Sequence, residues 1–72
     1  MSIAAALKQA GYPTHLFSAL DAAEAQGSAE VLRGVLDLIV TEAPFARPSL
    51  TATFRHLETR ARRALSRVEN KQ

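Results

Sequence analysis

The sequence predicts an all-α protein, and three observations lead to that class. Apolar residues recur at steps of three and four along most of the chain, which is the period of a helix buried on one side. Glycine and proline stand between these stretches, where helices end. The most β-rich piece, residues 36–41, alternates poorly and has no second strand to pair with. We predict one helical domain over residues 1–72, a small bundle of three short-to-medium helices and one long amphipathic C-terminal helix.

The first three helices have recognisable ends. Gly11 and Pro13 mark a turn between the first two, because glycine tolerates a positive φ and proline cannot continue a helix. Gly27 is suited to ending the second helix, and Ser28 to capping the third. We expect these helices at residues 3–10, 14–26 and 29–43.

The third helix is the most apolar one, and its polar residues form only a narrow strip, so we expect it to be surrounded on several sides. Arg33 and Asp37 are spaced to form an ion pair four residues apart. Gly34 costs a helix interior about 1 kcal/mol relative to alanine, which predicts a compensating close helix crossing there. The predicted core is centred on residues 31–40 and closed by Leu16, Phe17, Leu20, Leu50, Phe54 and Leu57.

Two prolines interrupt the pattern in the linker at residues 43–49. Phe45 lies between them. It is either a plug that fixes the corner of the fold or an exposed anchor for a partner, and corner plugs are the commoner case.

The last helix is expected at residues 49–69, with an apolar seam in heptad spacing. A chain of 72 residues buries only about 60% of the surface that its unfolded form exposes, and many such chains gain stability by oligomerising. No cysteine is present to form a disulfide. We therefore predict a homo-oligomer that associates through the seam, which consists of Leu50, Phe54, Leu57, Ala61, Ala64, Leu65 and Val68.

Charge is divided unevenly along the chain. Residues 50–72 carry six cationic side chains and two carboxylates, a net of +4, whereas residues 1–49 have a net of −2. Such a basic helix can bind nucleic-acid phosphates or an acidic protein, or it can lie against the acidic half of its own chain or of a sister chain. The candidate contacts are Arg55, Arg60, Arg62, Arg63 and Arg67.

A helix-turn-helix interpretation of residues 23–35 fails. Ala23 and Gly27 have the right spacing, but polar side chains occupy positions that should be buried, and apolar ones stand where base contacts are needed. The buried positions would be filled by Gln26, Ser28 and Arg33, and the base-contacting ones by Val31, Leu32 and Val35.

No catalytic, metal-binding or cofactor-binding pattern is present in the sequence. His15 and His56 are far apart in the chain, no phosphate-binding loop occurs, and no nucleophile has a base at a typical spacing. No apolar run approaches the roughly 20 residues of a membrane span, and the first residues make a poor signal peptide. We therefore expect a cytoplasmic protein that is not an enzyme and needs no cofactor.

These observations favour a non-enzymatic protein–protein interaction module, a small regulator or adaptor that binds another protein and self-associates through the seam. The alternative is a DNA-binding transcriptional regulator whose basic C-terminal helix contacts phosphates.

Overall fold

The computed structural model describes residues 11–70, and over this part the chain is all-α, as the sequence predicts. Three α-helices follow one another: α2 (Thr14–Gln26), α3 (Ala29–Glu42) and α4 (Thr51–Asn70). Two single-turn 3-10 helices, η1 (Ala43–Phe45) and η2 (Pro48–Leu50), form the corner between α3 and α4. The helix expected at residues 3–10 lies outside the described residues.

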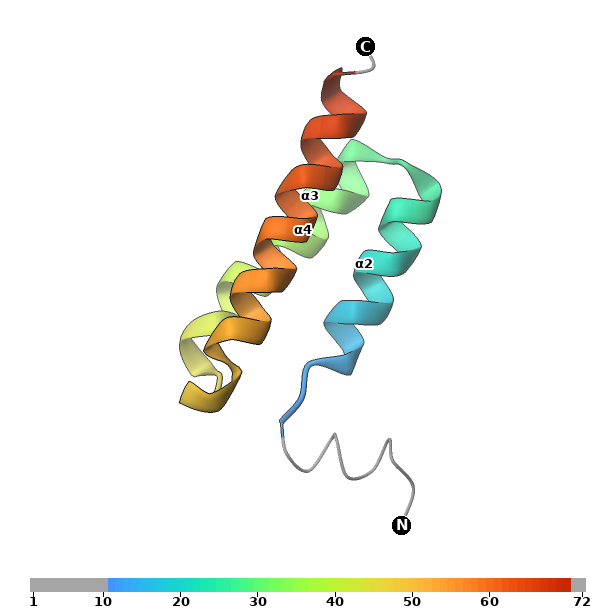
Figure 1. The fold of residues 1–72 in the computed structure, drawn as a ribbon. Helices are drawn as coiled ribbons and strands as arrows, with labels where there is room; N and C mark the ends of the chain where they lie inside the picture. Colours follow the sequence, from blue (N-terminus) through green and yellow to red (C-terminus); the bar gives the residue numbers. More distant parts are fainter. Residues whose placement is uncertain (1–10, 71–72) are drawn as a thin grey trace.

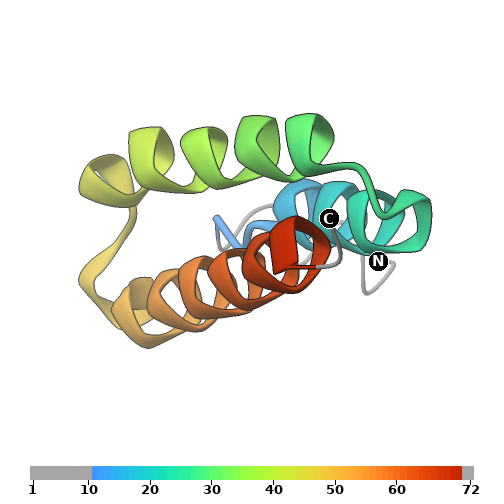
Figure 2. The ribbon, with the colours of Figure 1, turned by 90° about the horizontal axis from the view of Figure 1, so that it is seen from above.

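The helices form a small bundle in which α3 packs against both of the others (Figures 1 and 2). The chain reverses at the corner formed by η1 and η2, so α3 and α4 run antiparallel, side by side. α2 lies next to both helices and runs in the same direction as α4.

The boundary between α2 and α3 has the predicted capping residues. Gly27 adopts a left-handed conformation (φ 64°), and its N–H donates a hydrogen bond to the Ala23 carbonyl oxygen at 3.0 Å. The Oγ of Ser28 accepts a hydrogen bond from the Val31 N–H at 3.4 Å. These contacts satisfy backbone groups that helix ends leave unpaired, and they confirm the predicted end of α2 and start of α3.

The corner changes two predicted boundaries. α3 ends at Glu42, one residue early, because Pro44 has no N–H to continue the α-helical ladder and the chain tightens into η1. α4 begins at Thr51, two residues later than predicted, because the turn directly before it is the 3-10 helix η2. The Thr51 hydroxyl donates a hydrogen bond to the Pro48 carbonyl at 2.8 Å, which holds this turn against α4.

The core is formed by one face of each helix. Its fully buried large side chains are Leu16, Leu20, Leu32, Ile39 and Leu57. The expectation that α3 is surrounded is wrong over the described residues, because helices cover only two of its sides. Three apolar side chains of α3 are consequently exposed: Val31, Leu38 and Val40.

Two further expectations for α3 are also wrong. Gly34 does not lie at a helix crossing, since a Cβ added there would have no atom within 4 Å. Arg33 does not pair with Asp37 but with Glu69 of α4. α4 continues past Val68, the last residue of the seam, so Glu69 lies close enough to the Arg33 guanidinium to form this ion pair.

Candidate interaction surfaces

The predicted seam of α4 lies inside the chain's own core. Phe54, Leu57, Ala61 and Ala64 are buried against α2 and α3. The remaining seam residues, Leu50, Leu65 and Val68, are half-buried and pack against the same core. The heptad spacing therefore correctly indicates which face of α4 is apolar, but the structure places that face against the rest of the same chain and not on an open surface.

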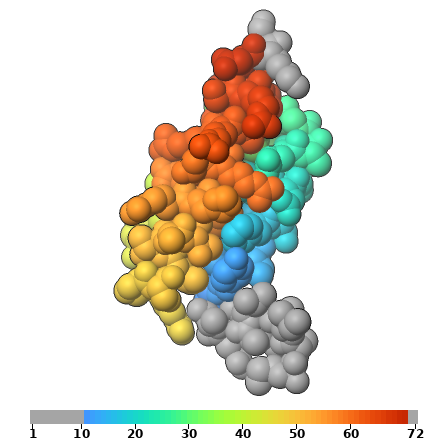
Figure 3. Space-filling model, in the orientation of Figure 1, coloured from blue at the N-terminus to red at the C-terminus, as the bar shows by residue number. Residues whose placement is uncertain are grey.

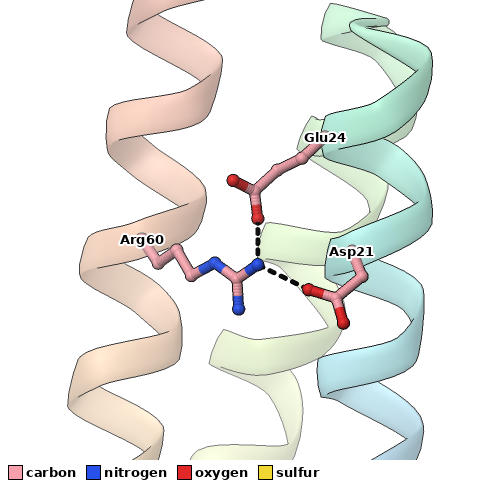
Figure 4. A network of polar contacts seen from close by, with 3 residues as sticks. All are labelled: Asp21, Glu24 and Arg60. Carbon is pink, nitrogen blue, oxygen red and sulfur yellow. Dashed lines mark hydrogen bonds and ion pairs between the residues drawn. The ribbon is translucent and has the colours of Figure 1, made fainter.

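Arg60 joins α4 to α2 through two carboxylates (Figure 4). Its Nη2 donates a hydrogen bond to Asp21 Oδ1 at 2.5 Å and forms an ion pair with Glu24 Oε1 at 2.6 Å. The hydrogen bond to Asp21 is the main reason that the pKa of the Arg60 guanidinium is raised; partial burial opposes the rise, and the nearby Glu24 adds to it. Part of the basic helix thus lies against the acidic half of the same chain, one of the predicted alternatives.

The other predicted arginines fall into two groups. Arg62 pairs with Glu58 one turn earlier in α4, with its Nη2 2.9 Å from Oε1. Arg55, Arg63 and Arg67 are exposed and form no ion pair with any residue in 11–70. We call these three arginines the basic surface. α4 occupies much of the face of the molecule shown in Figure 3, so a large ligand can approach this helix from solvent.

An apolar stripe that the sequence analysis did not single out runs along α3 and η1. Val31, Leu38 and Phe45 follow one another at intervals of seven residues, and they are 38%, 48% and 88% exposed. In an α-helix a spacing of seven places residues on nearly the same face, which is the relation between Val31 and Leu38; Phe45 follows in the 3-10 turn η1. We call these three residues the α3 stripe. Their spacing was visible in the sequence, but only the packing shows that no helix in the described part covers them.

The exposure of Phe45 excludes one of its two interpretations, and the anchor for a partner stays a prediction. The side chain is too exposed to act as a plug for the corner, so the commoner of the two interpretations is wrong. Phe45 instead lines an open pocket of about 250 Å³ next to Phe54 and Pro13. At its rim, His15 Nε2 lies 2.8 Å from Glu42 Oε1, an ion pair when the imidazole is protonated. The aromatic ring thus stands on the surface with a small apolar hollow beside it.

Neither a metal centre nor a membrane span is found in the described part of the chain. Within residues 11–70, no three His, Asp or Glu side chains come together as a group that could hold a metal ion. None of the described helices combines the length and the apolar character needed to cross a bilayer.

Comparisons of this chain with protein-family models, with curated proteins and with solved structures found no match. Any argument about function therefore starts from the two surfaces described above, the basic surface and the α3 stripe.

Proposed function

We propose that this chain is a non-enzymatic protein–protein interaction module, a small regulator or adaptor that docks through the α3 stripe. The observation that carries the proposal is the exposure of Phe45 in line with two further exposed apolar side chains, Val31 and Leu38. Large apolar side chains gathered on one exposed face are typical of interaction sites on small proteins. Aromatic anchors supply much of the free energy of protein–protein binding.

The pockets found along the described residues favour docking of a protein surface over enclosure of a drug-sized ligand. Four shallow pockets along the described residues have volumes of about 190 to 250 Å³. Small-molecule sites typically measure roughly 300–1,000 Å³. Burying one large apolar side chain stabilises a complex by about 1.5–3 kcal/mol, so docking on the stripe gains most from Phe45, the most exposed of the three.

Self-association stays a prediction, but its expected surface changes. Because the seam of α4 is occupied by α2 and α3, a second copy would have to use another face. Sedimentation velocity over a range of protein concentrations measures the association directly. A monomer at every concentration would remove the homo-oligomer from the proposal and leave a different protein as the partner.

Site-specific photo-crosslinking tests the docking proposal. A photoreactive phenylalanine analogue at position 45 preserves the aromatic ring and should form discrete adducts with a partner in the organism that encodes the chain. The same analogue at Ser18, an exposed position on α2, is the matched control. Adducts at both positions, or at neither, would contradict a docking surface centred on Phe45.

A second candidate function is DNA binding, and the basic surface favours it. Arg55, Arg63 and Arg67 are exposed on a helix whose other arginines are engaged in ion pairs. Guanidinium groups bind phosphates well. With each phosphate contact, the affinity for duplex DNA decreases more steeply as the salt concentration rises.

Fluorescence anisotropy of a labelled random duplex, titrated at about 50 and about 200 mM salt, tests the DNA-binding candidate. If the basic surface binds DNA, changing Arg63 and Arg67 together to alanine should weaken binding and flatten its salt dependence. Arg62→Ala is the control, because Arg62 is paired with Glu58. Equal binding by the wild type and the double variant would rule out Arg63 and Arg67 as the DNA contact, and the same titration of Arg55→Ala tests the remaining residue of the basic surface.

A further inference from the structure

The exposed face of α3 has a gap in its middle. The helical neighbours of Gly34, three and four residues away on either side, are Glu30, Val31, Asp37 and Leu38. All four are exposed. Two are carboxylates and two are apolar, so Gly34 separates an acidic track from an apolar one. A Cβ at position 34 would meet nothing within 4 Å, and the helix backbone is therefore open to close approach from outside.

The described fold makes no use of this gap. Glycine in a helix interior costs about 1 kcal/mol relative to alanine, and the close crossing that would offset that cost within the chain is absent. The two carboxylates are equally unengaged, since neither Glu30 nor Asp37 takes part in an ion pair within residues 11–70. Arg33, which has the spacing to pair with Asp37, is held by Glu69 instead.

We infer that a basic amphipathic helix of a partner protein docks across Gly34. Its apolar side covers Val31 and Leu38, and its cationic side chains lie near Glu30 and Asp37. The missing side chain at position 34 lets the two helix backbones approach closely, which improves packing between the apolar side chains. This inference rests on the proposed docking function and names the chemistry of the partner.

A second copy of this chain fits the same face less well. A two-fold interface brings the same patch of each copy together. If two copies of α3 cross at Gly34 in a parallel pair, Glu30 and Asp37 of one copy face Val31 and Leu38 of the other and lie at the interface without a cationic partner. In an antiparallel pair, the two carboxylates of one copy face those of the other. Like charges placed opposite each other oppose association. The basic helix α4 of a second copy does not supply the partner either, because its apolar face is buried in its own core.

Three labelled peptides of equal length test the inference. All three carry leucine along one helical face. The remaining positions are lysine in the first peptide, glutamine in the second and glutamate in the third. The lysine peptide should bind the full chain at least about tenfold more tightly than the glutamate peptide, a difference of about 1.4 kcal/mol. Because the chain has a formal net charge of +2, overall charge disfavours the lysine peptide, and its preference would report the local carboxylates.

Two variants locate the binding. Gly34→Gln fills the gap with a good helix former and should weaken the lysine peptide at least about tenfold. Ala25→Gln, at an exposed position on α2, should leave binding unchanged. Changing Glu30 and Asp37 together to glutamine and asparagine should remove the preference for lysine over glutamine while preserving binding of the glutamine peptide.

The outcomes separate this inference from the proposed function. Equal binding of all three peptides, lost in Leu38→Ser, would overturn the basic partner and leave the docking surface standing. If Gly34→Gln does not change the affinity for the lysine peptide, the peptide binds to another surface of the chain and the inference is overturned. Absence of binding up to about 200 µM would overturn it as well, and the crosslinking at position 45 would then decide the docking function. Dimerisation of the chain that Gly34→Gln abolishes would replace the partner by a second copy.

Discussion

Replacing Gly34 by alanine should stabilise the isolated chain. Gly34 lies in the interior of α3, is exposed, and has an ordinary helical φ. The added methyl group would meet no atom within 4 Å, so the structure offers no steric cost to set against the gain in helix propensity. That gain is about 0.8–1.0 kcal/mol, much of it from restricting the unfolded chain. In a domain of this size it corresponds to a rise in melting temperature of roughly 4–8 °C.

The matched control is the same substitution at Gly27. A Cβ there would also meet nothing within 4 Å, but Gly27 has a φ of 64°. The left-handed conformation costs a residue with a Cβ roughly 1–2 kcal/mol, so Gly27→Ala should lower the free energy of unfolding. The two variants add the same atoms to equally open positions, and they differ only in backbone conformation.

Urea unfolding followed by far-ultraviolet circular dichroism measures both effects. The midpoint should rise for Gly34→Ala and fall for Gly27→Ala, with an unchanged dependence of the free energy on urea in both cases. A lower midpoint for Gly34→Ala would show that a neighbouring group already occupies the space over Gly34, and it would refute the assignment of an open gap. Repeating the measurement at several protein concentrations shows whether that neighbour belongs to a second copy.

Three further predictions concern the packing and the ends of the helices. Leu57→Ala should cost about 2–5 kcal/mol, because Leu57 is fully buried, and most of the helical circular dichroism signal should disappear. Ser28→Ala should lower the free energy of unfolding by about 1 kcal/mol, since the Val31 N–H loses its acceptor; an unchanged midpoint of urea unfolding would contradict the cap. Arg60→Met should cost less than about 1 kcal/mol and lose part of that effect at high salt, and Asp21→Asn should then have no additional effect.

The local pattern of the sequence was sufficient to predict the three helices of the described residues. The bounds of α2 were predicted without error, because Gly27 and Ser28 have conformational requirements that a single residue can meet. The corner was less accurate, since a 3-10 turn and an α-turn share the same apolar spacing and differ only in their hydrogen bonds. The all-α class follows from the periodicity, the positions of glycine and proline, and the lack of a second strand, none of which requires knowledge of which helices touch.

The surfaces required knowledge of packing. A heptad seam looks the same whether it packs on a second copy or on the same chain, so the burial of Leu57 and Ala61 could not be predicted from spacing. Likewise, the exposed side of α3 could be identified only after α2 and α4 were placed on its other sides. Phe45 illustrates the limit most clearly, because an aromatic residue between two prolines fits both a plug and an anchor, and the commoner of the two, the plug, is the one that its exposure excludes.

Gly34 and the α3 stripe are expected to lower the stability of the free chain and to favour the docked state. In the isolated chain, glycine at position 34 lowers stability by about 1 kcal/mol, and the exposed apolar side chains contribute less than they would if buried. A helix that docks there reverses both terms, because it uses the gap for close approach and covers the stripe. Partner binding at about 100 times its Kd would stabilise the chain by about 2.7 kcal/mol. Gly34→Ala should therefore raise the stability of the free chain while reducing the extra stability that the docked helix confers, and a merely structural glycine would show only the first effect.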